Sequence, residues 1–159
     1  MTYSRFRPWF DQCLGNWVSH RRYLYYGTRE TPSIQNIRTF FSTTATGTDE
    51  NQYTISWESK ILGPDGEPIR QGSDGVMHLT LLGDRLSRDI GYFTTEPTCC
   101  DLEMLDDETT IFHTNYGGQT FREEIRFSTP DTRLRQTVGT HDDDQRLALV
   151  GQYFEVRLP

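Results

Sequence analysis

Apolar and polar residues alternate with a period of two along most of the chain, which is typical of β-strands with one apolar and one polar face. In Gln52–Leu62, for example, Tyr53, Ile55, Trp57 and Ile61 share one face, and polar residues occupy the other. Short clusters of glycine, proline and aspartate separate such runs and predict tight turns. The pattern predicts ten strands, which span Asn16–Tyr26, Ile34–Ser42, Gln52–Leu62, Val76–Leu82, Arg85–Phe93, Cys99–Leu105, Thr109–Tyr116, Gln119–Phe127, Thr132–Thr140 and Gln145–Leu158.

Only the N-terminal segment departs from this period. Its apolar and cysteine side chains are spaced as on one face of a helix, and they are Phe6, Trp9, Phe10, Cys13 and Leu14. Ser4 could cap this helix, Pro8 is tolerated in its first turn, and Gly15 is expected to end it. We therefore expect a short helix that plugs or flanks one end of the sheet.

Ten short strands with short connections predict an antiparallel up-and-down meander. We expect it to close into a barrel within a single domain of residues 1–159, since closure removes exposed sheet edges. A two-sheet sandwich is the main alternative. Apolar residues make up only 34% of the chain, but 3 Trp, 8 Tyr and 9 Phe argue against disorder. This composition favours a barrel with a polar or ligand-filled interior.

Charge and cysteine content exclude several classes of protein. The net charge is −7 and no basic run exceeds two residues, so nucleic-acid binding is not expected. No apolar run approaches the roughly 18–20 residues of a membrane span, and the N-terminus lacks the apolar core of a signal peptide. We therefore expect a cytoplasmic protein without membrane association. The 3 cysteines and 4 histidines show no metal-ligand spacing, so no metal site is expected.

Several charged residues share a strand face with aromatic residues. Trp17 and Arg21 share one face of the first strand, and Glu123 lies on the same face of its strand as Phe121. Glu155 shares a face of the last strand with a tyrosine and an arginine. An inward carboxylate needs a cationic partner or a raised pKa. The simplest interpretation is that these acids and arginines pair with one another, and the alternative is a binding site.

The strand Thr132–Thr140 is less regular. One of its faces carries Arg133, Arg135 and Thr137, and the other carries a leucine and a valine. The pattern alone predicts that the leucine and valine point inward and that the arginines are solvated. This orientation conflicts with a binding role for the arginines, unless both faces are covered or the arginines lie at the barrel mouth.

Gly15 and Trp17 form a Gly-x-Trp motif at the start of the first strand. The motif resembles the lipocalin-type signature, in which a tryptophan packs across the barrel base under an arginine of the last strand. Arg157 is placed to stack on Trp17 in this way, so we expect both residues to be part of the scaffold. Pairing of Arg157 with an inward carboxylate is the alternative.

A longer segment carries a more specific resemblance. Residues 123–135 read Glu-Glu-Ile-Arg-Phe-Ser-Thr-Pro-Asp-Thr-Arg-Leu-Arg, which resembles the E-R-[IL]-x-F-x-[ST]-P-x-x-R-L-R segment of the S/U-type phycobiliprotein lyases, the CpcS/CpeS family. Shorter stretches at 15–21, 55–58, 86–92 and 155–157 are similar to other motifs of this family and occur in the same order. Together the matches span nearly the whole chain.

The resemblance implies a ten-stranded antiparallel barrel of the lipocalin/fatty-acid-binding-protein-like kind that binds a linear tetrapyrrole. It implies an enzyme that attaches phycocyanobilin or phycoerythrobilin through a thioether to a cysteine of a phycobiliprotein alpha or beta subunit, with no cofactor. The residues that it places at the site are two bilin-nitrogen ligands or proton donors (Glu123 and Glu155), two propionate-binding arginines (Arg133 and Arg135) and three residues of the bilin pocket (Arg21, Trp57 and Thr137).

Two other functions fit the same fold. One is a carrier that stores a bilin without transferring it, and the other is a chaperone that recognises only the antenna protein. The resemblance also leaves a homodimer open, and it implies the cytosol of a cyanobacterium or the plastid of an alga.

Overall fold

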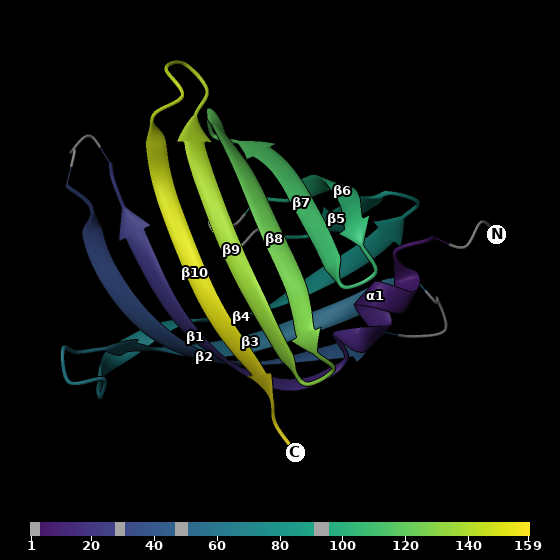
Figure 1. Ribbon diagram of the computed structural model, residues 1–159, viewed down its shortest axis with the longest axis horizontal. Coiled ribbons are helices and arrows are strands. Elements are labelled where there is room, and N and C mark those ends of the chain that lie inside the picture. The colour runs from purple at the N-terminus through teal and green to yellow at the C-terminus, as the bar shows by residue number, and fades with distance from the viewer. Residues whose placement is uncertain (1–3, 28–30, 47–50, 91–95) are drawn as a thin grey trace.

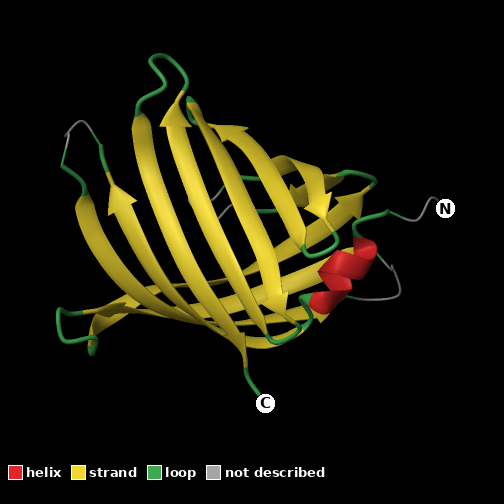
Figure 2. Ribbon diagram, in the orientation of Figure 1, coloured by secondary structure: helices red, strands yellow, loops and turns green. Residues whose placement is uncertain are grey.

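The computed structural model describes residues 4–27, 31–46, 51–90 and 96–159, which form one helix and ten antiparallel strands (Figure 1). The elements are α1 (Arg7–Gln12), β1 (Gly15–Tyr25), β2 (Ser33–Ala45), β3 (Gln52–Leu62), β4 (Pro68–Leu82), β5 (Arg85–Arg88), β6 (Thr98–Asp106), β7 (Thr109–Tyr116), β8 (Gln119–Thr129), β9 (Thr132–His141) and β10 (Leu147–Arg157). Each strand pairs with its neighbours in sequence, and β1 pairs with β10 to close a barrel (Figure 2). The expected all-β barrel with a short N-terminal helix is confirmed, and the sandwich alternative is wrong.

Strand bounds differ from the prediction mainly in β4 and β5. β4 begins at Pro68 instead of Val76, because its polar first half pairs with β3 through backbone hydrogen bonds that need no apolar face. β5 ends at Arg88, and residues 91–93 of the expected strand lie outside the described residues. β10 begins after Gln145, whose φ of 61° is typical of a turn.

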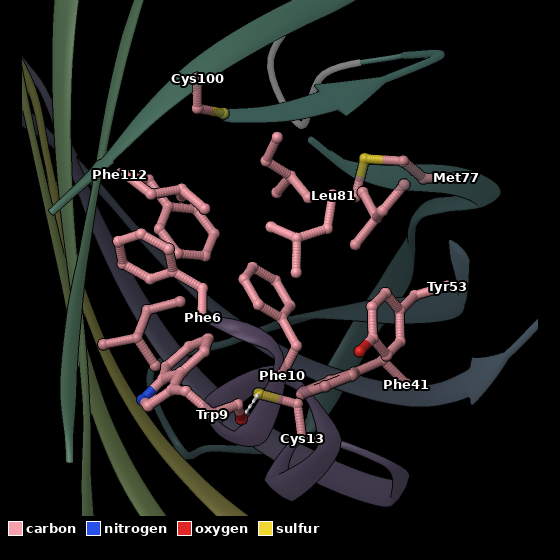
Figure 3. Packing of buried hydrophobic residues seen from close by; sticks show 14 of the residues in the cluster. Phe6, Trp9, Phe10, Cys13, Phe41, Tyr53, Met77, Leu81, Cys100 and Phe112 are labelled. Atoms are coloured by element: carbon pink, nitrogen blue, oxygen red, sulfur yellow. Dashed lines mark hydrogen bonds between the residues drawn. The ribbon is translucent and has the colours of Figure 1, made fainter. Parts of the chain in front are cut away.

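The helix α1 lies at one end of the barrel, where its apolar side chains join the hydrophobic core (Figure 1). Trp9 and Phe10 are buried, and each ring centroid lies 6.0 Å from that of Phe112 on β7. Figure 3 shows these rings gathered with Met77 and Leu81 of β4. The expected end plug is therefore confirmed. In the described part of the chain, no helix is long and apolar enough to cross a membrane.

The two ends of α1 differ from the sequence-based expectation. Phe6 is the N-cap, and no side chain caps the helix. Ser4 instead accepts a hydrogen bond from the Phe6 N–H at 3.2 Å and donates one to the carbonyl of Gly83, which ties the segment before the helix to the β4–β5 turn. Pro8 lies in the first turn, as expected, but the helix ends before Gly15, which opens β1 instead.

Arg157 of β10 and Trp17 of β1 stack on each other at the end of the barrel that carries α1. The guanidinium carbon of Arg157 lies 4.4 Å from the centre of the Trp17 ring, and Trp17 is fully buried. Arg157 also donates hydrogen bonds to backbone carbonyls just after and within the end of α1. The expected stack is therefore confirmed. The charge partner of Arg157 is Asp131 at 3.0 Å, so the alternative pairing with an inward carboxylate is wrong.

Gly15→Ala is expected to destabilise the barrel, because φ at Gly15 is 127° and an added Cβ would lie 2.7 Å from a guanidinium nitrogen of Arg157. Backbone strain of this kind costs about 1–3 kcal/mol of unfolding free energy, which urea denaturation measures. The matched control is Gly83→Ala, where φ is 65° and an added Cβ meets no atom within 4 Å. Equal losses in the two variants would contradict a clash with Arg157.

Candidate functional site

Within the part of the chain that the structure describes, six charged side chains point into the barrel from five strands, and each is at most 8% exposed. They are Arg21 on β1, Arg88 on β5, Glu123 on β8, Arg133 and Arg135 on β9, and Glu155 on β10. Arg21, Glu123 and Glu155 share strand faces with aromatic residues, which predicts that they point inward, and the structure confirms these three orientations.

The orientation that the pattern predicts for β9 is wrong. Arg133 and Arg135 are each 5% exposed, whereas Leu134 is 47% exposed on the outer face. The arginines face inward because their neighbours across the strand pairs bring carboxylates next to them: Arg133 pairs in register with Glu155. A buried charge is tolerated where an opposite charge and a hydrogen bond offset its desolvation.

Glu155 is the centre of the first ion-pair cluster. The Arg133 Nε–H donates to Glu155 Oε1 at 2.8 Å, and Arg21 Nη2 lies 3.7 Å from Glu155 Oε2. Ser19 accepts a hydrogen bond from Arg21 Nε at 2.9 Å, which holds this guanidinium next to Glu155. The Arg133 guanidinium lies over the Trp17 ring, 5.0 Å from its centre. Each oxygen of this carboxylate therefore faces a guanidinium group.

Glu123 is the centre of the second cluster. Arg135 Nη2 donates to Glu123 Oε2 at 2.7 Å, and Arg88 Nη1 lies 3.5 Å from Glu123 Oε1. Arg88 reaches this carboxylate from β5, three strands away around the barrel, and its guanidinium lies 5.3 Å from the centre of the Phe112 ring. Glu123 is thus held between two cations that come from different walls.

The two clusters set the protonation state of both carboxyl groups. Burial by itself raises the pKa of Glu155, but Arg133, Arg135 and Arg21 outweigh it and lower this pKa to about 2. The pKa of Glu123 is lowered in the same way, since its two arginines outweigh its burial. Both groups are therefore carboxylates at neutral pH, and in this state they accept hydrogen bonds instead of donating protons.

Tyr153 lies between the two clusters. The guanidinium carbons of Arg21 and Arg135 lie 5.1 and 4.7 Å from the centre of its ring. Its hydroxyl is 3.1 Å from the hydroxyl of Thr137, which is fully buried. Burial raises the pKa of Tyr153 well above its usual value, so this side chain is neutral. Thr137 therefore contributes to the site through its hydroxyl contact with Tyr153.

Trp57 lies on another wall, on β3. Its ring packs against the backbone of Gly75, where an added Cβ would lie 2.8 Å from a ring carbon. Trp57 and Arg21 line the same cavity of about 200 Å³. Tyr25, at the end of β1 remote from α1, also lines this cavity, which places it at the open end of the barrel. We refer to it as the mouth cavity.

A smaller cavity of about 30 Å³ lies deeper in the barrel, next to α1. Arg88, Arg133 and Arg135 line it together with apolar side chains such as Phe10 and Met77. Its volume suits about one or two water molecules. Three of the four inward arginines therefore line the inner cavity beside the hydrophobic core, whereas Arg21 lines the mouth cavity.

The six inward charges do not balance. Within the described part of the chain they comprise four guanidinium groups and two carboxylates, a difference of two positive charges, although the whole chain carries −7. A buried excess of charge is unfavourable and is relieved by an ion of opposite sign. The arrangement is therefore suited to an anionic ligand that carries two negative groups.

Sequence reasoning missed Arg88 and Tyr153. The shared face of Tyr153 and Glu155 on β10 was a usable signal, because residues two apart point the same way. Arg88 shares a face with Leu86, but the four residues of β5 are too few to orient a strand by pattern. Nothing local indicates that Arg88 would meet Glu123.

The buried thiols are not activated. Burial raises the pKa of Cys13 to about 11 in spite of Arg133, whose Nη1 lies 3.2 Å from the sulfur. Burial likewise raises the pKa of Cys100. Both thiols are therefore neutral and poor nucleophiles. Among the residues that the structure describes, no group of three or more His, Cys, Asp or Glu side chains could hold a metal ion.

The fold and the site define a small β-barrel whose ion-paired interior is suited to an anionic ligand. The family model described as CpeS-like protein matches residues 72–158, which include five of the six inward charges. Since this match covers more than half of the chain, the protein belongs to the CpeS-like family. The resemblance found in the sequence is thereby confirmed.

Individual relatives agree with this assignment. The chain is 28% identical over 168 residues to a protein of Nostoc sp. (strain PCC 7120) provisionally named phycocyanobilin lyase CpcS 2, covering 98% of this chain and 92% of the relative. It is 31% identical to a protein of Picosynechococcus sp. (strain PCC 7002) provisionally named chromophore lyase CpcV, covering 65% of this chain and 48% of that relative. The S-type phycobiliprotein lyase CpeS of Guillardia theta shares the fold, with a TM-score of 0.73, 19% identity and coverage of 100% and 99% of the two chains.

Proposed function

We propose that this protein is a chromophore lyase that binds a linear tetrapyrrole and attaches it to a cysteine of a phycobiliprotein subunit. The observation that carries the proposal is that guanidinium groups outnumber carboxylates by two among the described residues inside the barrel. A bilin has two propionates, which match this excess in number and in charge, and planar guanidinium groups bind carboxylates through paired hydrogen bonds. The names of the relatives support the same reaction class.

The volumes favour a partly exposed bilin. Sites for ligands of drug size usually measure about 300–1,000 Å³, whereas the mouth cavity has about 200 Å³ and the inner cavity about 30 Å³. We therefore expect the pigment to bind at the mouth beside Trp57 and Arg21, with its propionates toward Arg133 and Arg135. One edge then remains open to a second protein, which a transfer reaction requires.

The chemistry is an addition. The thiol of the acceptor protein adds to the ethylidene double bond on ring A of the bilin: a carbon–sulfur bond forms, and the thiol proton ends on the pigment. Protonation of the tetrapyrrole makes that double bond more electrophilic, and a nearby carboxylate favours the protonated cation. Glu123 and Glu155 suit this role as anions, and their lowered pKa values favour nitrogen ligands over the alternative of proton donors.

The nucleophile belongs to the acceptor in this proposal. Cys13 and Cys100 are buried neutral thiols, so neither is suited to form a covalent intermediate with the pigment. The protein would then act by positioning the bilin and by excluding water and wrong orientations. We extend the proposal to the cytosol of a cyanobacterium or the plastid of an alga, where such acceptors occur.

A transfer assay tests the proposal. The protein is mixed with phycocyanobilin or phycoerythrobilin and an apo-subunit, and the subunit is examined for covalent, zinc-induced fluorescence after denaturing electrophoresis. A fluorescent subunit band supports a lyase, whereas coloured protein without transfer would indicate the carrier. Enhanced recovery of soluble subunit without pigment binding would indicate the chaperone. The outcome with each bilin also identifies the preferred pigment.

Arg133→Ala and Arg135→Ala are each expected to weaken bilin binding by about 1.5–3 kcal/mol, because each removes a charge-assisted hydrogen bond to a propionate. The dissociation constant is measured by titration of the bound pigment's absorbance. Arg126→Ala is the matched control, since Arg126 is exposed on the outer face of β8. Unchanged affinity in both β9 variants, with native circular dichroism, would place the two arginines outside the binding site.

A further inference from the structure

The two partners of Glu123 are not equivalent. Arg135 donates to Glu123 Oε2 at 2.7 Å and contacts Tyr153, whose ring also contacts Arg21 of the mouth cavity. Arg88 lies 3.5 Å from the other oxygen and contacts Phe112 instead. Phe112 belongs to the hydrophobic core next to α1 (Figure 3). Both guanidinium groups line the inner cavity, but Arg135 is linked through Tyr153 to Arg21 of the mouth cavity, whereas Arg88 contacts a ring of the core.

In the proposed function Arg135 and Glu123 each bind a different group of the ligand, which conflicts with their bond to each other in this geometry. Arg135 has to bind a propionate and Glu123 has to bind a pigment nitrogen, but in this structure these two groups bind each other. A ligand carboxylate that takes Arg135 breaks this bond and leaves Glu123 buried with one cation fewer. A buried carboxylate that loses its cations is unfavourable and tends to take up a proton.

We propose that Arg88 is a positioning residue that holds Glu123 as an oriented anion while Arg135 leaves Glu123 for a carboxylate of the ligand. This inference rests on the proposed function and deepens it. Binding is then an exchange of ion pairs: the ligand carboxylate replaces Glu123 on Arg135, and the protonated ligand nitrogen replaces Arg135 on Glu123. The site thereby selects tetrapyrroles whose propionates are free.

The protonation state of the bound pigment shows whether Arg88 holds Glu123 as an anion. In the complex the proton can lie on the pigment nitrogen or on Glu123, and the positive charge of Arg88 next to Glu123 favours the nitrogen. Among the described residues, the groups that also interact electrostatically with Glu123 include Cys100 on β6, Tyr116 on β7, Arg135 on β9 and Tyr153 on β10. Burial raises the pKa of both tyrosines and of the thiol, so these three are neutral near pH 7 and do not replace Arg88.

The first experiment uses the unmodified protein and two probes, phycocyanobilin and its dimethyl ester. We expect the free acid to bind with the red-shifted absorbance of the protonated pigment. The ester has no carboxylate charge to replace Glu123 on Arg135. It is therefore expected to bind with the spectrum of the neutral pigment. A red shift of equal size with the ester would overturn the ion-pair exchange.

The second experiment replaces Arg88. In Arg88→Met the ratio of protonated to neutral bound pigment is expected to fall about tenfold, the effect of roughly one pKa unit. The fall should persist between about pH 6 and 8, because the proton moves within the complex. Arg88→Lys keeps the charge and should restore most of the red-shifted band. Arg85→Met is the matched control, since Arg85 lies on the same strand and pairs with Asp101 at the surface.

These outcomes separate the inference from the proposed function. If Arg88→Met binds pigment with the parent's spectrum, the positioning role of Arg88 is wrong and the lyase proposal stands. If the parent binds neither probe, the proposed function itself fails. If Arg88→Met does not fold, the comparison of the two probes on the parent protein still decides the exchange.

Discussion

Glu155→Gln is expected to lower the free energy of unfolding by about 3–5 kcal/mol, because it leaves Arg133 and Arg21 buried without their shared carboxylate. The carboxylate is fully buried and is bonded by Arg133 at 2.8 Å, so no water replaces it without rearrangement of the barrel. Urea denaturation at pH 7 measures the loss. A loss of this size would make Glu155 one of the main determinants of stability in this barrel.

The same substitution is expected to change how stability depends on pH. The pKa of Glu155 is about 2 in the folded protein and ordinarily 4.5. A depressed pKa stabilises the fold above the unfolded value, and the stabilisation is lost as pH falls from about 4.5 toward 2. Glu155→Gln lacks this contribution, so its stability should decrease less steeply over that range than the parent's.

Glu103→Gln is the matched control for these measurements. Glu103 is 53% exposed and lies 2.9 Å from the His113 ring nitrogen on the outer surface, where a single polar contact contributes little. We expect its unfolding free energy at pH 7 to stay within about 1 kcal/mol of the parent's. If Glu155→Gln resembled this control in both measurements, the buried cluster would not stabilise the fold in the way that its geometry indicates.

Glu123→Gln is expected to weaken the red-shifted absorbance of bound bilin and to slow transfer to the acceptor by about 10²–10³-fold. The amide keeps the size of the side chain but removes the negative charge that favours the protonated, electrophilic pigment. The rate of appearance of covalent subunit fluorescence measures the effect under single-turnover conditions. Binding should be less affected than transfer, because the propionates and their arginines remain.

The matched control is Glu124→Gln, one residue further along β8. Glu124 faces outward and pairs with Arg122 at 3.5 Å on the surface, so its loss should change neither the absorbance nor the rate. A Glu123→Gln variant that transfers bilin as fast as this control would remove the carboxylate from the mechanism. The barrel would then act only by orienting the bilin. If the parent protein also transferred bilin slowly, the result would favour the carrier hypothesis.

The sequence itself carried much of the fold. Alternation fixed the bounds of β3 and β7 to the residue, and helical spacing at the N-terminus placed α1. These features depend on neighbours two to four positions apart, so a single chain displays them without any tertiary contact. The same parity oriented Arg21, Glu123 and Glu155 correctly, because each shares a face with aromatic residues that must be buried.

Only the tertiary structure decided what these charges meet. The pattern oriented β9 wrongly, since it weighed a leucine and a valine against two arginines without knowing that carboxylates lie opposite. The pattern did not predict the contact between Arg88 and Glu123. The two residues lie on β5 and β8, and they meet only when the sheet curves so that these strands face each other. Periodicity is a local property of the chain, whereas the charge balance of an interior is a property of the closed barrel: the group of four guanidinium groups around two carboxylates is complete only once β1 and β10 have joined and brought Arg21 to Glu155.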